Sequence, residues 1–334
     1  MQPPLAAEVY RGNVVESRHY ATAVMVDSKG KVIYAAGDKE RPTSLRSGAK
    51  PLQVLPLFTS GTAEAYRFSL PQVAVMCASH SGQIIHQEQV LGILERVGLA
   101  ESHLQCGVHR PFHRATARAL AEAGEKPKPR HNTCSGKHAC MLAITRHRGW
   151  DIKTYTKIEH PVQQEMLAAV ARMTDLARDK IDIGLDTCGV PVFAVPIYNI
   201  ALAYARLSRP EEGRGRWREG MEAIGAAMGR YPELLAGEGR LVTALLQAYK
   251  GEILAKDGGE ALFCLGIPSR GWGLAVKIED GSERALAPVV INLLRETGII
   301  PGSLPAILEA FACPVIRTHQ GQLAGRIEPV KLFG

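Results

Sequence analysis

The chain has 334 residues, of which 46% are hydrophobic and 22% charged, a composition typical of a globular protein with a sizeable core. Its formal net charge is +7, but the basic stretches at residues 124–130 and 206–218 are short and broken by Pro and Gly. We therefore expect no nucleic-acid partner. No apolar run reaches the ~18 residues of a membrane span, and residues 1–7 lack the pattern of a signal peptide. These features predict a cytoplasmic protein with no membrane partner.

The first 36 residues have the pattern of β structure. Apolar and alternating residues predict strands at 7–17, 21–27 and 31–36, with a hairpin turn at 28–30. Apolar residues at helical spacing then predict a series of helices, at residues 44–61, 83–98, 113–124, 137–148, 160–174, 198–207, 217–230 and 239–250. Strands follow at 252–255, 259–265 and 273–279, then helices at 284–296 and 303–311 and a short tail.

Two strand-rich regions thus enclose a long helical one. This order predicts an α+β fold in which the outer strands form one sheet and the helices pack over and beside it. We expect a single catalytic unit over residues 1–334, with a sheet part at about 1–45 and 252–334 and a helical part at about 46–251. A cleft between the two parts is the expected site.

Ser47 and Lys50 stand at the start of the first predicted helix. Ser47 suits an N-cap, but a capping box would place Glu or Gln where Lys50 stands. The positive end of the helix dipole disfavours the lysine charge and should lower the lysine pKa. A neutral Lys50 amine could take the Ser47 proton, which makes Ser47 a candidate nucleophile. An ordinary cap beside a solvated lysine is the alternative.

Three further segments carry polar residues. Ser79 and His80 lie in a loop after a short helix, and Ser79 is a candidate second nucleophile or proton relay. Cys134, Lys137 and His138 crowd around a helix start where Ser135 suits an N-cap. Cys188 lies in a turn beside Asp186, so zinc is a candidate ligand if this turn meets the Cys134 loop. Buried packing thiols are the alternative.

Lys256 lies between two late strands, in the sequence Lys-Asp-Gly-Gly. An Asp-Gly hairpin turn explains this segment without function. A strand Lys-x-Gly beside a Ser-x-x-Lys helix is also the arrangement of serine acyl-transferring enzymes.

Taken together, these motifs resemble those of the class 3 L-asparaginases, or L-asparaginase II family, a group with a fold similar to serine β-lactamases and glutaminases. The resemblance is carried by these segments: Arg41-Pro42, Arg46-Ser47-x-x-Lys50, Cys77 to Gly82 (CASHSG), Cys134 to His138 (CSGKH), Asp186-x-Cys188 and Ala255-Lys256-x-Gly258. It implies an antiparallel sheet made of N- and C-terminal strands, hydrolysis of L-asparagine to aspartate and ammonia, and a homodimer.

The resemblance also implies a role for each site residue. Two serine–lysine tandems would be catalytic, Ser47 with Lys50 and Ser79 with Lys256. Zinc would be held by Cys134, Lys137 and Cys188 and would aid substrate binding without supplying the nucleophile. The remaining residues would shape the substrate pocket: Arg46, His80, His138 and Asp186. Asp257 departs from the family pattern, and its charge should raise the Lys256 pKa and weaken that lysine as a base.

The attacking serine could be Ser47, with Ser79 as a shuttle, or the roles could be reversed. A glutaminase, a penicillin-recognising hydrolase, and a non-catalytic zinc or amino-acid-binding protein are the alternative functions.

Overall fold

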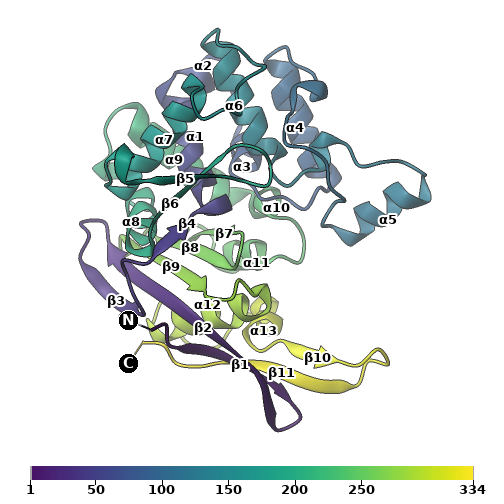
Figure 1. The fold of residues 1–334 in the computed structure, drawn as a ribbon, viewed down its shortest axis with the longest axis vertical. Coiled ribbons are helices and arrows are strands. Elements are labelled where there is room, and N and C mark those ends of the chain that lie inside the picture. Colours follow the sequence, from purple (N-terminus) through teal and green to yellow (C-terminus); the bar gives the residue numbers. More distant parts are fainter. Residues whose placement is uncertain (1, 334) are drawn as a thin grey trace.

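A computed structural model describes residues 2–333. Its larger sheet lies at one end of the molecule and most of the helices at the other (Figure 1). The eight strands of this sheet are β1 (Leu5–Arg11), β2 (Val14–Asp27), β3 (Val32–Ala36), β7 (Leu254–Gly258), β8 (Leu262–Ile267), β9 (Trp272–Ile278), β10 (Val315–Arg317) and β11 (Leu323–Pro329).

The sheet joins the two ends of the chain. Its order is β10-β11-β1-β2-β9-β8-β7, all neighbours are antiparallel, and β3 also pairs with β2. The long β2 spans both halves, because residues 14–20 pair with β1 and residues 21–27 with β9. The predicted α+β fold, with a sheet from N- and C-terminal strands, is confirmed.

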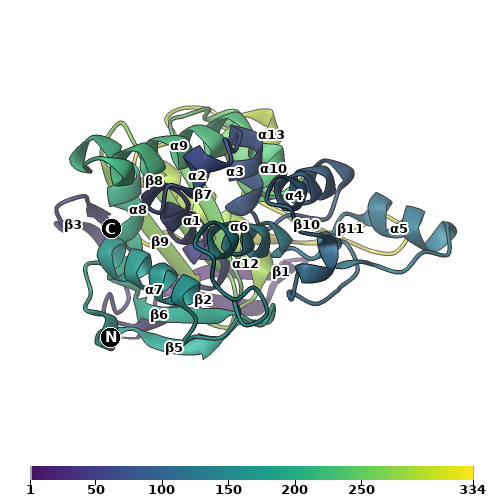
Figure 2. The same cartoon turned by 90° about the horizontal axis from the view of Figure 1, so that it is seen from above.

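Most of the chain between these strands is helical. The α-helices of the structure are α1 (Lys50–Thr59), α2 (Thr62–Ala65), α3 (Leu70–Met76), α4 (Ile84–Arg96), α5 (Arg114–Glu122), α6 (Ser135–His147), α7 (Pro161–Thr174), α8 (Ile197–Leu207), α9 (Arg216–Arg230), α10 (Pro232–Leu235), α11 (Leu241–Ala248), α12 (Glu283–Glu296) and α13 (Ala306–Ala312). Short 3-10 turns are η1 (Arg46–Ala49), η2 (Glu101–His103), η3 (Pro129–His131), η4 (Arg178–Lys180) and η5 (Pro210–Glu212). Helix α5 lies on an arm that extends away from the other helices (Figure 2). Within residues 2–333, no helix is long and apolar enough to cross a membrane.

The structure corrects the prediction at both ends of the chain. The strand predicted at 7–17 is two strands, because Gly12 adopts a positive φ of 58° and turns the chain between β1 and β2. The predicted tail instead supplies β10 and β11, which extend the sheet beside β1. Their sequence alternates too weakly to indicate strands, and pairing with β1 decides their conformation.

The helical region also contains a small sheet that the sequence analysis missed. Strands β4 (Pro42–Ser44), β6 (Pro191–Pro196) and β5 (Asp182–Leu185) pair in that order, all antiparallel. The pairing of β4 with β6 fixes the chain that leads into η1. The turn that connects β5 to β6 carries Asp186 and Cys188, so this small sheet positions two of the predicted site residues.

Helix α1 lies at the centre of the core. Its side chains Leu52, Leu55 and Leu57 are fully buried, and the helix contacts α3, α6, α7 and α9. Helix α8 packs across β2, β8 and β9. A Cβ on Gly273 of β9 would lie 2.0 Å from the Ala201 carbonyl oxygen, so the absence of a side chain allows this close contact. The rigid packing around α1 places its first residue, Lys50, inside the protein.

Candidate functional site

Ser47 and Lys50 lie where strand β4 leads into α1. The predicted N-cap at Ser47 is wrong: Ser47 is inside the 3-10 turn η1, and α1 begins at Lys50 after Ala49. Neither start has a side-chain cap, since the chain is packed and held by backbone pairing instead. Arg46 has a positive φ of 43°, which is a strained conformation for a residue with a side chain. Strain of this kind beside a hydroxyl is typical of functional sites.

Two buried lysine amines converge on the hydroxyl of Ser79. Lys50 Nζ is 3.0 Å and Lys256 Nζ 2.8 Å from Ser79 Oγ, and both lysine side chains are fully buried. Ser79 follows α3 in a loop whose backbone is fixed by a hydrogen bond from Ser79 N to Leu235 O. One hydroxyl can accept from one amine and donate to the other, so this arrangement provides a path for a proton between the two lysines.

Further contacts of Lys50 link this serine to the cysteine loop. Lys50 Nζ donates to Ala78 O at 2.7 Å and is 3.4 Å from Thr133 O, next to Cys134. Ser47 is half-buried, and among residues 2–333 no hydrogen bond joins its side chain to Lys50. The structure thus pairs Lys50 with Ser79 directly and leaves the Ser47 hydroxyl unengaged.

Lys256 lies within strand β7 and not in the predicted turn, which comes later, at residues with positive φ, Glu260 and Ala261. Its burial lowers its pKa to about 8, whereas the adjacent Asp257 carboxylate acts in the opposite direction. Asp257 therefore raises the Lys256 pKa as expected, but the expected net rise is wrong because desolvation outweighs it. A lysine with this pKa is neutral in roughly a tenth of the molecules at pH 7, far more than a lysine with the ordinary pKa.

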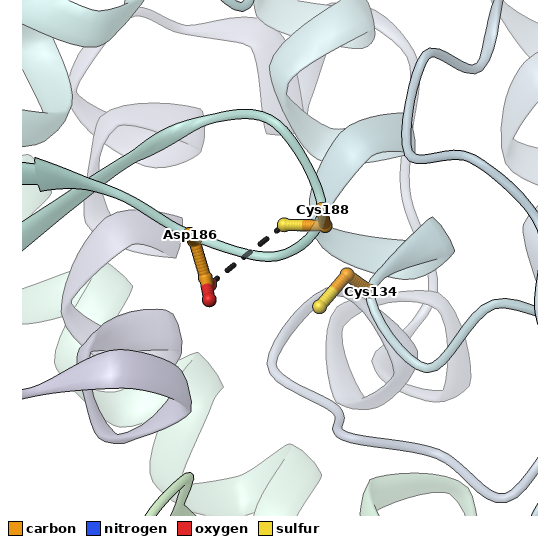
Figure 3. Close-up of side chains that lie close together, drawn as sticks. All are labelled: Cys134, Asp186 and Cys188. Atoms are coloured by element: carbon orange, nitrogen blue, oxygen red, sulfur yellow. Dashed lines mark hydrogen bonds between the residues drawn. The ribbon is translucent and has the colours of Figure 1, made fainter.

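The two candidate metal-binding thiols meet in space. Cys134 precedes α6, Cys188 lies in the turn between β5 and β6, and Figure 3 shows both beside Asp186. One ligand atom from each of these three buried residues lies within 4.8 Å of the others. Tetrahedral zinc with thiolates at ~2.3 Å requires ligand separations of roughly 4 Å. The donor set and its spacing therefore fit zinc.

Lys137 extends into the same cluster, where its Nζ is 3.4 Å from Asp186 Oδ2. Burial opposes its charge, but the two cysteine thiols and Asp186 together raise the Lys137 pKa above its usual value. A hydrogen bond with Cys188 lowers the pKa of Cys134 well below that of a free thiol. The cluster thus combines anionic groups with the ammonium of Lys137. Lys137 would have to lose one proton to become a ligand of a divalent cation.

Asp186 connects this cluster to the start of η1. Its Oδ1 accepts from Arg46 Nε at 2.9 Å, and its backbone neighbour Thr187 donates to the same oxygen. Although burial opposes ionisation, Lys137 and Arg46 lower the Asp186 pKa to about 2. This ion pair ties Arg46, the residue with the positive φ, to the turn that carries Cys188.

A glycine brings α6 close to α3. A Cβ on Gly136 would lie 1.9 Å from the Val75 carbonyl oxygen, so no larger residue fits between these helices. This contact sets where Cys134 and Lys137 lie relative to the loop that carries Ser79. The sequence indicated an N-cap at Ser135, but α6 begins at Ser135 itself, and its hydroxyl donates to Arg130 O.

The two histidines predicted to shape the pocket are both fully buried. His80 Nε2 is 2.9 Å from Ser135 Oγ, and its Nδ1 accepts from Gly82 N, so His80 connects the two loops. His138 Nδ1 is 2.7 Å from Tyr155 Oη, whereas its Nε2 has no hydrogen-bond partner within the described residues. An unpaired buried imidazole nitrogen is costly unless a ligand or water contacts it.

Several groups that complete the site were not found from the sequence. Arg240, which precedes α11, is 2.7 Å through Nη2 from Asp257 Oδ2. The Lys50 acceptors are main-chain carbonyls of Ala78 and Thr133, and Tyr204 fixes η1 by donating to Gly48 O. Backbone carbonyls carry no sequence signal, and Arg240 lies in a polar loop where arginine is unremarkable.

Comparison with solved structures shows distant similarities. A β-lactamase from Mycobacterium bovis shares 14% identity at a TM-score of 0.41, with 83% of this chain and 94% of that chain covered. A simvastatin synthase variant from Aspergillus terreus shares 13% identity at a TM-score of 0.39, covering 83% and 93%. At these scores, neither similarity supports a conclusion about the site.

Sequence comparison is more informative. No curated protein matches the chain. The family model described as L-asparaginase II matches residues 7–329, which include every candidate site residue named above. The chain therefore belongs to the L-asparaginase II family.

Proposed function

We propose that this protein hydrolyses the side-chain amide of L-asparagine through a serine acyl-enzyme. The observation that carries the proposal is the convergence of two buried lysine amines, Lys50 and Lys256, on Ser79 Oγ. Such a network accepts and returns protons without any histidine. Family membership supports asparagine as the substrate.

In this mechanism Ser47 attacks the amide carbon. Its half-buried hydroxyl is unengaged and follows the strained Arg46, whereas the Ser79 hydroxyl is held between two amines. Lys50 takes the Ser47 proton as the new C–O bond forms, and Ser79 passes a proton between Lys50 and Lys256. The C–N bond then breaks, and the leaving amide nitrogen takes a proton and departs as ammonia. Water hydrolyses the aspartyl ester and restores Ser47.

The pocket residues hold the substrate between charges of both signs. The Arg46 side chain is 24% exposed, and it supplies a cation for the substrate carboxylate, whereas Asp186 supplies an anion for the amino group. Among the described residues the Tyr155 hydroxyl contacts no acceptor other than His138 Nδ1, so we assign it as the donor in this bond and place the His138 proton on Nε2. This buried N–H has no hydrogen-bond partner within the described residues, and it is the donor that we assign to a substrate oxygen. His80 acts by holding the two loops together.

Zinc would be held by Cys134, Cys188 and Lys137, with Asp186 as a fourth group within reach. When bound, the metal supplies positive charge that helps to hold the substrate. The nucleophile and the proton path come from the serines and lysines, so chelation should weaken substrate binding more than it slows the chemical step.

Ammonia release and aspartate formation from asparagine test the proposal. We expect Ser47→Ala to lower kcat by several orders of magnitude and to abolish the aspartyl-enzyme seen by intact-mass spectrometry after rapid quench. Ser79→Ala should slow both formation and hydrolysis of that species. Ser81→Ala is the matched control, because Ser81 lies in the same loop and its hydroxyl donates to Gln83. Near wild-type ammonia release by Ser47→Ala would exclude Ser47 as the nucleophile.

The same assay separates the alternatives. Glutamine and nitrocefin are offered as substrates beside asparagine, and we expect asparagine to give the highest kcat/KM. Calorimetric binding of asparagine without aspartate formation would instead indicate a non-catalytic binding protein. Light scattering of the purified protein tests the homodimer that we propose from the resemblance.

A further inference from the structure

We propose that Asp257 and Arg240 are positioning residues for Lys256: Asp257 aims the lysine amine at Ser79, and Arg240 holds Asp257. This inference rests on the proposed function. The three charged groups form a chain, in which Lys256 Nζ contacts the Asp257 carboxylate and Asp257 Oδ2 is 2.7 Å from Arg240 Nη2. Lys256 is fully buried, whereas the side chains of Asp257 and Arg240 are 17% and 34% exposed.

The contacts of the amine determine its orientation. Lys256 Nζ has three partners: Ser79 Oγ at 2.8 Å, Asp257 O at 2.8 Å and the Asp257 carboxylate. The two acceptors on Asp257 occupy two N–H groups. In the neutral amine, the remaining tetrahedral position towards Ser79 is therefore the lone pair, which can accept the hydroxyl proton. Asp257 thus selects which face of the amine meets the serine.

The Asp257 carboxylate that orients the amine also favours its protonation, and Arg240 offsets this effect. An unpaired carboxylate beside Lys256 would favour the ammonium, which cannot accept a proton. Arg240 binds the second carboxylate oxygen and offsets the negative charge, so the first oxygen can orient the amine without retaining its proton. Arginine suits this role because it stays charged throughout the working pH range.

Other titratable side chains also face Lys256. Lys50 on α1 faces it across Ser79, and Cys264 on β8 is its register partner. Cys77, after α3, adds a thiol whose burial raises its pKa to about 12, so it stays neutral. Burial, Lys50 and Arg240 all lower the Lys256 pKa, and Asp257 alone raises it. The balance between Asp257 and Arg240 therefore sets how much neutral amine is present.

A surface cavity gives water access to the pair. It has a volume of about 340 Å³ and is lined by Arg240, Asp257, Phe263, Arg284 and Phe311 among others. Arg240 can thus be substituted without creating a cavity in the hydrophobic core, and Arg284 is a matched control. Arg284 lines the same cavity but contacts His19.

The test compares Arg240→Gln, Asp257→Asn and Arg284→Gln by two measurements. The first is the pH profile of kcat/KM for asparagine. The second is an NMR titration of the lysine side-chain signals, with the Lys256 signal assigned from its loss in Lys256→Met. The titration needs no substrate, so it tests the pairing of Lys256, Asp257 and Arg240 independently of activity. A wild-type protein that does not hydrolyse asparagine would contradict the proposed function and leave this test valid.

We expect opposite changes in the two variants. Arg240→Gln should move the Lys256 titration and the acidic limb of the profile upward by about one pH unit, with a roughly tenfold loss at pH 7 that recovers at pH 9. Asp257→Asn should move both downward and lower the plateau rate about tenfold, because the amine loses its anchor. Arg284→Gln should leave both unchanged. Titrations that stay in place in both variants, or move in the same direction, would overturn the proposal.

Discussion

Lys256 and Lys137 are both buried lysines, yet the structure moves their pKa values in opposite directions. Burial lowers the pKa of Lys256 to about 8. The charges of Lys50 and Arg240 act in the same direction, and Asp257 opposes them. Lys137 lies among Cys134, Cys188 and Asp186, which raise its pKa despite burial. Desolvation is common to both sites, so the sign of the neighbouring charge decides the outcome.

This difference separates the site into two parts with different chemistry. The Ser79 network joins two buried lysine amines through one hydroxyl, and burial lowers the pKa of one of them, Lys256. The thiol cluster holds a lysine whose charged form is favoured by Cys134, Cys188 and Asp186. The Thr133 carbonyl, which is 3.4 Å from Lys50 Nζ and adjacent to Cys134, connects the two parts.

The largest effect should follow removal of the base. Lys50→Met eliminates one amine from the Ser79 network, and we expect ammonia release to fall by about a thousandfold or more. Lys277→Met is the control, because this partly buried lysine lies on β9 and not beside Ser79. Retention of more than a tenth of the activity by Lys50→Met would place the base elsewhere.

Breaking the thiol cluster should affect metal content first. Elemental analysis of the wild-type protein should give about one zinc per chain, and Cys188→Ser should weaken binding by roughly a hundredfold or more. Cys313→Ser provides the comparison, since Cys313 is exposed and outside the cluster. Zinc binding should also weaken as the pH falls, because the ligands must lose protons. Equal zinc in both variants would contradict this assignment.

Asp186 should contribute stability that depends on pH. Asp186→Asn leaves Arg46 and Lys137 without their buried anion, and we expect a loss of about 3 kcal/mol in the free energy of unfolding at pH 7. The folded pKa of about 2 lies below the usual 3.8, so this contribution is present above pH 3.8 and is lost as the pH falls towards 2. Urea unfolding at both ends of this range measures it. Asp175→Asn, an exposed pair with Arg206, should change stability by less than about 0.5 kcal/mol.

The smallest expected effect concerns the helix contact that aligns the two parts. Gly136→Ala forces a methyl group against the Val75 carbonyl and should cost about 1–3 kcal/mol of stability. Gly225→Ala on α9 is the matched helical control, because its nearest neighbour, Leu254 Cδ2, would be 3.9 Å away. Thermal unfolding compares the two. An equally stable Gly136→Ala protein would show that α3 and α6 can separate without cost.

Much of the fold follows from local sequence patterns. Helical periodicity located α4, α7 and α8 to within a few residues, and the turn at 28–30 correctly joined β2 to β3. The short strands β5, β6, β10 and β11 were missed because local propensity for strands of this length is weak. Each pair forms a hairpin that a distant strand extends, since β6 also pairs with β4 and β11 also pairs with β1. The N-caps expected at Ser47 and Ser135 are wrong, because both serines lie inside their elements and neither element has a side-chain cap.

By itself, the sequence determined which chemical groups the site would contain, because the spacing of Ser47 with Lys50 and the cysteine-containing segments are local patterns. Only the tertiary structure decided which groups meet. It joined Lys50 and Lys256 to Ser79, which is 29 residues from the first lysine and 177 from the second, and it brought Asp186 to both Arg46 and Lys137. It also set the directions in which the pKa values of Lys137 and Lys256 move, because charge and burial act through space and leave no trace in the order of residues.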